Sequence, residues 1–218
     1  GLCEVLAGCR RLDHALGAPA VLATLTAQVS VAETFLPACQ EKQRAEVLAM
    51  LAQSHQLNGW LAFDQGQVPG AVRAFTAAAE YARAAGRADL TAYVLGPSHG
   101  FALTYSGRPD QGVRFGQAAL DQALHTGNPR LTAFVRATTA RAHARLGQAG
   151  AALRLLDQAE DDLGRVDVSE PVPDWLTVFD VAALHGHRGS CLLDLGRSAD
   201  AVEELVTQED IAPRCFAR

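Results

Sequence analysis

The side chains of this sequence that could do chemistry are its histidines, cysteines and carboxylates, and their spacing does not build an obvious catalytic or metal site. His185 and His187 form an HGH pair. On a helix, two residues at this spacing point about 200° away from each other, so the pair is not expected to bind one metal ion. His55, His99 and His143 precede glycines by 11, 8 and 4 residues. Because these offsets differ, we interpret them as structural or solvated histidines.

Other catalytic and metal-binding patterns do not emerge either. The sequence contains no glycine-rich phosphate loop after a strand and no Ser-His-Asp ordering that indicates a triad. The acidic pairs Asp161–Asp162 and Glu203–Glu204 are interpreted as solvated helix faces. Five cysteines without a CxxC pair favour buried free thiols over disulfides or a zinc site. We predict that the protein is not an enzyme, with no catalytic residues, metal or cofactor; an enzyme acting through its histidines is the remaining alternative.

Composition restricts the classes of protein further. Apolar residues make up 49% and charged residues 20% of 218 residues, which is typical of a folded globular protein. The formal net charge of −5 argues against direct nucleic-acid contact by this part of the chain. No run of about 18 apolar residues predicts a membrane span, and charges interrupt the start where a signal peptide would be apolar. We therefore expect a cytoplasmic protein without membrane contact.

The elements that position the side chains are all predicted to be helices. Between Gly59 and Ala85 two amphipathic helices flank a tight turn at Gly66. Alanine and leucine dominate the rest of the chain, without the alternating β-branched runs that indicate strands. Pro97 falls inside one predicted helix and should kink or split it near Gly96. The predicted helices span residues 2–16, 20–35, 39–65, 69–85, 88–105, 109–125, 129–146, 149–163, 175–195 and 198–208.

The turn glycines repeat along the chain. Gly66, Gly107, Gly147 and Gly196 are separated by 41, 40 and 49 residues, and the extra length of the last interval lies in an acidic, proline-containing segment at 164–174. A constant period of this size predicts stacked helix hairpins, because each hairpin buries its apolar face only against its neighbours. We divide the chain into an edge hairpin (1–37), three hairpins (38–165), a linker (166–174) and a further, truncated hairpin (175–218).

Gly59, Ala71, Phe75 and Ala78, set around the turn at Gly66, resemble the landmark positions of the tetratricopeptide repeat (TPR). The same pattern recurs more loosely around the later turn glycines, so the resemblance covers about residues 39–208. It implies an all-α, right-handed α-solenoid of stacked antiparallel helix hairpins. The period of about 40 residues exceeds the family's usual ~34, so the curvature of the solenoid is not carried over.

The TPR resemblance also implies where partners bind. In that family the first helix of each hairpin faces a concave groove, and the corresponding positions here form an aromatic wall followed by two arginines. The aromatic side chains could bury an apolar ligand, and the arginines could hold a carboxylate. Packing between helices, or pairing of the arginines with acidic residues of the adjacent helix, is the alternative. The expected groove residues are Gln56, Trp60, Asp64, Phe101, Tyr105, Phe134, Arg141 and Arg145.

A narrower resemblance concerns three stretches. GWLAFDQG, AAEYARAAGRADLTAYVL and PDWLTVFDVAALHGHRGSCLLDLGR are similar to the C-terminal repeat region of bacterial helix-turn-helix regulators of the Cro/repressor type. This implies a sensor or interaction domain that binds a peptide, protein or small-molecule effector, with a DNA-binding domain elsewhere in a longer chain. A free-standing adaptor for protein–protein interaction is the alternative, and a homodimer is possible for either.

Overall fold

The computed structural model describes residues 2–16, 21–167 and 169–211, and no β-strand occurs among them. Predicted features at residues 1, 17–20, 168 and 212–218 lie outside this part. Three short helical turns are η2 (Leu36–Ala38), η3 (Val94–Gly100) and η4 (Asp174–Leu176). The α-helices are α1 (Leu2–Leu16), α2 (Leu22–Phe35), α3 (Glu41–Asp64), α4 (Val68–Ala84), α5 (Ala88–Tyr93), α6 (Phe101–Tyr105), α7 (Pro109–Thr126), α8 (Pro129–Arg145), α9 (Ala149–Leu163), α10 (Val181–Asp194) and α11 (Ser198–Ile211).

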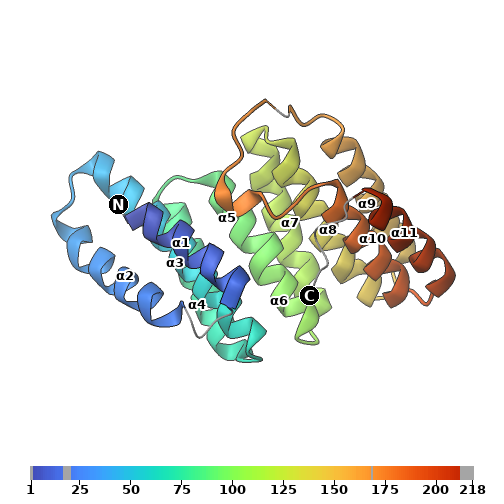
Figure 1. Cartoon of the computed structure of the whole chain (residues 1–218), viewed down its shortest axis with the longest axis horizontal. Coiled ribbons are helices and arrows are strands. Elements are labelled where there is room, and N and C mark those ends of the chain that lie inside the picture. Colours follow the sequence, from blue (N-terminus) through green and yellow to red (C-terminus); the bar gives the residue numbers. More distant parts are fainter. Residues whose placement is uncertain (1, 17–20, 168, 212–218) are drawn as a thin grey trace.

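Four antiparallel hairpins form the stack, as Figure 1 shows. They pair α3 with α4, α5 and α6 with α7, α8 with α9, and α10 with α11. The first helix of each hairpin packs against the hairpin before it, so the apolar faces close into continuous cores. The prediction of an all-α, right-handed α-solenoid of stacked antiparallel hairpins is confirmed.

Each hairpin turn depends on a glycine. Gly66, Gly107, Gly147 and Gly196 have φ angles of 73°, 80°, 71° and 75°, in the left-handed region that other residues rarely adopt. At the first turn the amide of Gln67 donates to the carbonyl oxygen of Ala62, which closes the end of α3. The glycine spacing in the sequence therefore marks the hairpin turns.

Small and bulky residues meet where the two helices of a hairpin cross. A Cβ atom on Gly59 would lie 2.6 Å from the ring of Phe75, and one on Gly189 would lie 2.9 Å from Leu205. Both pairs occupy corresponding places in the first and last hairpins. The close approach of the helices thus depends on glycine at these positions.

The helix predicted over 88–105 contains a π-helical turn, η3, between α5 and α6. Pro97 lies inside this turn and has no amide hydrogen to donate to the carbonyl oxygen of Tyr93. The hydroxyl of Ser98 donates to that oxygen instead, over 3.3 Å. The predicted irregularity at Pro97 is therefore a widened turn that stays within the helical path.

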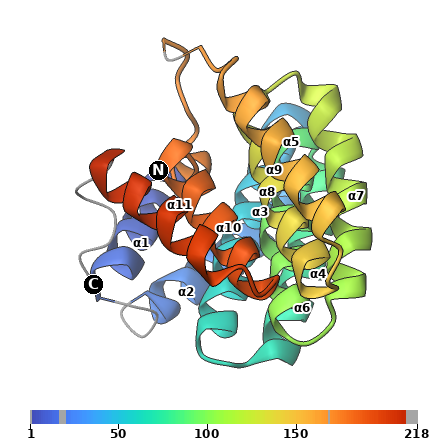
Figure 2. The ribbon, with the colours of Figure 1, turned by 90° about the vertical axis from the view of Figure 1, so that its right-hand side faces the viewer.

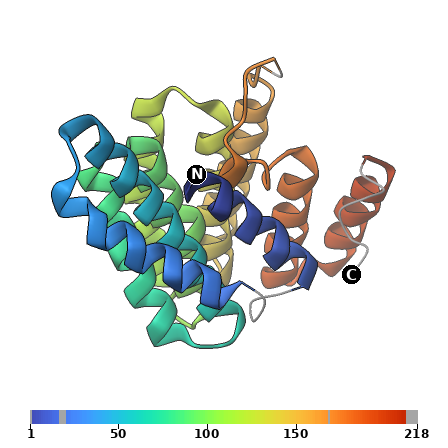
Figure 3. The same cartoon turned by 60° about the vertical axis from the view of Figure 1, so that its left-hand side comes forward.

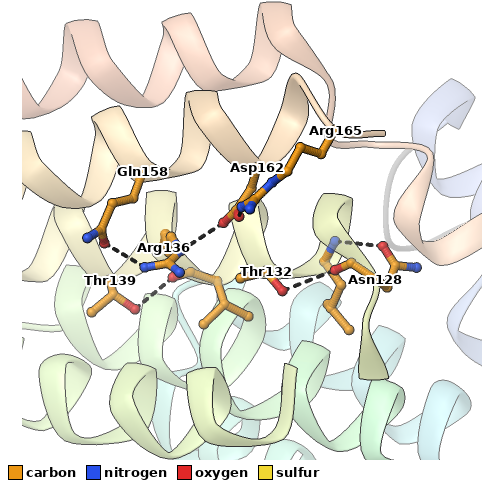
Figure 4. Close-up of polar contacts among 9 residues, drawn as sticks. Asn128, Thr132, Arg136, Thr139, Gln158, Asp162 and Arg165 are labelled. Atoms are coloured by element: carbon orange, nitrogen blue, oxygen red, sulfur yellow. Dashed lines mark hydrogen bonds and ion pairs between the residues drawn. The ribbon is translucent and has the colours of Figure 1, made fainter. Parts of the chain in front are cut away.

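A carboxylate joins α8 and α9 (Figure 4). Asp162 is 3% exposed; Arg136 Nε donates to its Oδ2 over 2.8 Å, and Arg165 donates to its Oδ1. The interpretation of Asp162 as part of a solvated face was wrong, because this residue turns toward α8, whereas Asp161 is exposed.

The last hairpin begins later than predicted. Residues 174–176 form the short turn η4, and α10 starts at Val181 behind Asp180, whose side chain accepts a hydrogen bond from the amide of Ala183 over 2.9 Å. Because this cap stabilises a helix that begins at Val181, it disfavours a helix that begins nearer Trp175. Trp175, Leu176 and Phe179 of the connecting segment are buried in the stack.

α1 does not continue the row of hairpins. It crosses the side of the stack that the first helices form, and α7 lies on the opposite side (Figures 2 and 3). Leu6 and Cys9 of α1 pack with Leu57 and Leu61 of α3, next to α2. α1 therefore covers part of the surface on which TPR-like domains are expected to bind partners.

Candidate functional site

A cavity of about 410 Å³ lies between α1 and the first helices of three hairpins. This volume falls in the range of pockets that hold small organic molecules. Segments far apart in the sequence supply its walls: α1, α3, the α5–η3 segment, α8 and the segment that follows the linker. The lining residues are Ala7, Arg10, Arg11, Asp13, Gln56, Leu57, Trp60, Tyr93, Pro97, Ser98, Phe134, Asp174, Trp175, Thr177 and Val178.

Four aromatic side chains dominate the cavity wall. Tyr93 lies between Trp175 and Phe134, with ring centroids 4.8 Å and 6.3 Å away, and Trp60 lines the cavity from α3. Tyr93 and Trp175 belong to one apolar core, which fixes their positions. The wall is thus both apolar and held in place, as binding of a flat apolar group requires.

Two polar side chains of the cavity wall, Gln56 and Ser98, are ordered by η3. Gln56 Nε2 donates to Ser98 Oγ over 3.1 Å, while Ser98 donates to the carbonyl oxygen of Tyr93. Because Pro97 has no amide hydrogen to donate, the carbonyl oxygen of Tyr93 is available to accept the hydrogen bond from Ser98. The irregular turn therefore sets the hydrogen-bonding character of the cavity wall.

Arg10 brings a positive charge into the cavity from α1. Its Nη1 donates to Gln53 Oε1 over 3.2 Å, and its Nη2 is buried without a hydrogen-bond partner among the described residues. Burial lowers the pKa of Arg10 from its ordinary value, and the nearby Tyr93 and Asp174 act in the opposite direction. The guanidinium stays charged, because its ordinary pKa is far above neutral pH.

A second aromatic cluster continues from the cavity along the stack. Phe101 lies 5.8 Å from Trp60 and 4.6 Å from Tyr105, between ring centroids. Neither Phe101 nor Tyr105 lines the cavity, although Trp60 belongs to both the cavity and this cluster. The expected aromatic wall is thus a connected set of rings, of which one end borders the cavity.

The two expected arginines face a carboxylate of the protein itself. Arg141 and Arg145 lie over the ring of Tyr105, at 5.1 Å and 4.5 Å from its centroid. Their nitrogens are 3.9 Å and 3.5 Å from the carboxylate oxygens of Asp194 in the next hairpin. They lie outside the cavity, as does the exposed Asp64, whose pKa is raised by partial burial and by Asp13.

Of the eight expected groove residues, Gln56, Trp60 and Phe134 line the cavity. Sequence reasoning missed Arg10, Tyr93 and Trp175. The carried-over TPR positions describe only repeat helices, so they could not include α1 or the segment after the linker. A tryptophan directly after a proline-containing linker was the signal available for Trp175.

His187 and Cys191 are held inside the stack. His187 packs against Phe101, Phe134 and Phe179, and burial lowers its pKa to about 3. Burial raises the pKa of Cys191 to about 12. Among the described residues no group of three histidine, cysteine or acidic side chains is arranged to hold a metal ion, and no helix is long and apolar enough to cross a membrane.

Comparison with known proteins supports the fold. No family model and no curated protein matches the chain. A solved structure from Podosopora anserina, described as a kinesin light chain with nearly identical TPR-like repeats, matches with a TM-score of 0.59 and 16% identity. The match covers 98% of this chain and 97% of that one. The chain thus has a TPR-like fold, as its repeat landmarks indicated.

Proposed function

We propose that this chain is a non-catalytic binding module, and that it is the cytoplasmic sensor or interaction part of a bacterial transcriptional regulator. In this proposal it binds a peptide or small-molecule effector on the side formed by the first helices. The observation that carries the proposal is the cavity of about 410 Å³, whose wall combines ordered aromatic rings with polar and charged side chains. TPR-like repeat domains are characteristically interaction scaffolds, and this cavity gives the scaffold a place for a ligand.

The position of the cavity suggests how binding would be transmitted. One ligand would touch α1, three successive hairpins and the segment after the linker at the same time. A ligand shifts a conformational equilibrium only if it binds one arrangement better than another. A molecule that contacts five segments would favour the arrangement in which they lie together, and an attached domain could respond to that change.

Two features support the regulator role. The three stretches similar to bacterial helix-turn-helix regulators include Trp60, Tyr93 and Trp175, which line the cavity. The net charge of −5 disfavours DNA contact by this part, so DNA recognition would belong to another domain. The reading frame upstream of Gly1 tests this directly: a helix-turn-helix segment would support the proposal, and an immediate start codon would contradict it.

Substitutions test the site. We would screen peptides and metabolite-sized molecules for binding, then compare Trp60→Ala and Phe134→Ala with the unmodified protein by calorimetry. Loss of a central aromatic contact should weaken binding of a hit by about tenfold or more. Phe35→Ala is the matched control, because this phenylalanine is exposed on α2. Unchanged affinity in Trp60→Ala and Phe134→Ala would remove the cavity as the binding site.

A free-standing adaptor is the second candidate. The observation that favours it is a set of exposed apolar side chains on α10 and α11, at Leu193, Val202 and Val206. Such a surface suits a protein partner or a second copy of the chain. Sedimentation at increasing concentration distinguishes a homodimer from a monomer, and replacement of Val202 and Val206 by serine should abolish any dimer. A monomer at all concentrations would contradict self-association through this surface.

A further inference from the structure

We propose that the cavity selects an organic anion, namely a small molecule with a flat apolar body and one carboxylate that Arg10 binds. This inference rests on the proposed function, because it names the class of ligand for the same cavity. Two observations carry it: Arg10 lines the cavity and has one guanidinium nitrogen without a hydrogen-bond partner among the described residues, and four aromatic rings line the same cavity. The rings are those of Trp60, Tyr93, Phe134 and Trp175.

The guanidinium has one hydrogen-bonding nitrogen to spare. Arg10 Nη1 is engaged by the neutral amide of Gln53, whereas Nη2 is covered by other atoms and has no hydrogen-bond partner among the described residues. A ligand therefore reaches Nη2 only after a shift of the Arg10 side chain. An unsatisfied buried donor costs free energy, and a charged donor costs more than a neutral one. A carboxylate oxygen is the acceptor that offsets this cost best, because the hydrogen bond is then assisted by opposite charges.

Asp13 and Asp174, the acidic residues that line the cavity, do not take the place of the ligand carboxylate at Arg10. Asp174 is exposed, and Asp13 interacts with another group of the chain. Water screens the charge of an exposed carboxylate, while the interaction of a ligand anion with a buried guanidinium is screened much less. The cavity therefore favours an anion in front of Arg10, even though its lining contains two arginines and two aspartates.

The size and shape of the cavity restrict the class of ligand that it can hold. About 410 Å³ accommodates a metabolite-sized molecule rather than a long peptide. The rings of Tyr93 and Trp175, with centroids 4.8 Å apart, offer flat apolar surfaces near the guanidinium. A planar ring or chain would bury its apolar area there, and its acid group would face Arg10.

The protein carries its own reporter for this test. The chain has two tryptophans, Trp60 and Trp175, and both line the cavity. Both tryptophans therefore report on a molecule that enters the cavity. The variants Trp60→Phe and Trp175→Phe separate the two signals while keeping an aromatic ring in each place.

The experiment compares three probes with one apolar body: 3-phenylpropionate, 3-phenylpropanol and 3-phenylpropylamine. Each is titrated into the full chain, and tryptophan fluorescence is followed. For ligands this small, dissociation constants on the order of millimolar are expected. The anion should bind about tenfold more tightly than the alcohol, the effect of a hydrogen bond to a charged group. The amine should bind most weakly.

Variants assign the preference to Arg10. Arg10→Gln should bind the acid and the alcohol equally, and Arg10→Lys should keep part of the difference because it keeps the charge. Arg73→Gln, an exposed position on α4, is the matched control and should behave like the unmodified protein. Circular dichroism checks that each variant folds. Gln53→Ala removes the link between α1 and α3 but leaves the guanidinium, so it should retain the preference for the acid.

The outcomes distinguish the inference of an anionic ligand from the proposed function of the chain as a binding module. Equal binding of all three probes, or a preference for the acid that survives in Arg10→Gln, would overturn the anion inference and leave the cavity as a small-molecule site. Absence of a fluorescence response to any of the three probes, at concentrations about ten times the expected millimolar dissociation constant, would overturn the anion inference alone. If the three probes do not bind but a long peptide binds and quenches the fluorescence of Trp60, the cavity is a peptide site instead.

Discussion

At the residue scale, two histidines lie among aromatic rings in the stack. His99 is 5% exposed and packs between Phe75 and Phe115, whose ring centroids are 5.8 Å and 4.3 Å away. Burial, with a smaller contribution from Arg108, lowers the pKa of His99 to about 4. The pKa of His187 is lowered to about 3 by burial and then by Arg141. Both rings are therefore neutral at pH 7.

This makes folding stability depend on pH. An unfolded histidine binds a proton near pH 6.5, whereas folded His99 does so only near pH 4. Stability is therefore full above pH 6.5 and falls as the pH drops from 6.5 toward 4, by at most about 1.4 kcal/mol per pH unit for each such histidine. His99→Leu should reduce this slope in urea titrations at several pH values. An unchanged slope would contradict the assignment, and His125→Gln, an exposed position, is the control.

The buried carboxylate of Asp162 gives a second prediction. Asp162→Ala leaves Arg136 half-buried and without its carboxylate, although Gln158 still accepts from its Nη1 over 2.5 Å. Loss of one partner of a buried ion pair typically costs about 3 kcal/mol. Denaturant unfolding measures this loss. The exposed neighbour Asp161→Ala should stay within about 0.5 kcal/mol of the unmodified protein. Equal effects in the two variants would show that the pair contributes little.

At the element scale, the π-helical turn η3 holds the second hairpin close to its neighbours. A Cβ atom on Gly96 would lie 2.9 Å from Cβ of Ala119 and 3.4 Å from a methyl group of Val135. The turn thus packs against α7 and α8 through a residue without a side chain. The same turn places Ser98 and Pro97 in the cavity wall, so one element contributes both to the packing of the stack and to the cavity.

Gly96→Ala should therefore destabilise the protein by about 1–3 kcal/mol, because two packed neighbours would have to move. It should also change the tryptophan fluorescence, since the cavity wall shifts with η3. Gly70→Ala is the matched control in α4. Its new methyl group would meet nothing closer than 3.7 Å, so this change should be neutral or stabilising by a few tenths of a kcal/mol. Equal stability of the two variants in thermal unfolding would contradict the packing argument.

At the scale of the whole molecule, local signals predicted the architecture. The left-handed glycines at 66, 107, 147 and 196 mark the hairpin turns, because almost no other residue adopts that backbone conformation. The small and bulky residues around these turns determine how closely the two helices of a hairpin pack. The division of the chain into an edge hairpin, three hairpins, a linker and a last hairpin stays a prediction, as does the set of eight groove residues.

The cavity could be predicted only in part. Trp60 and Phe134 follow from repeat positions, since each is set by its own hairpin. Arg10 depends on where α1 comes to lie, which is decided by contacts between segments far apart in sequence. Asp162 was misread because its helix turns that side chain toward α8 instead of water. Periodicity within one helix carries little information about either contact.

A ligand in the cavity should stabilise the whole stack. At ten times its dissociation constant, 3-phenylpropionate should raise the free energy of unfolding by about 1.4 kcal/mol, because it binds the folded state only. Circular dichroism and tryptophan fluorescence should then report one coincident, shifted thermal transition. A shift seen by fluorescence alone would mean that the cavity segments unfold separately from the remaining hairpins.

The position of α1 also has a consequence for biosynthesis. α1 leaves the ribosome before the hairpins do, yet Arg10 shares the cavity with Asp174 and Trp175, more than 160 residues later in the chain. Repeats can fold as they emerge, one hairpin upon the next. The cavity, in contrast, closes only after the linker has been translated. A nascent or prematurely terminated chain that ends before Asp174 would therefore display folded hairpins without the complete cavity.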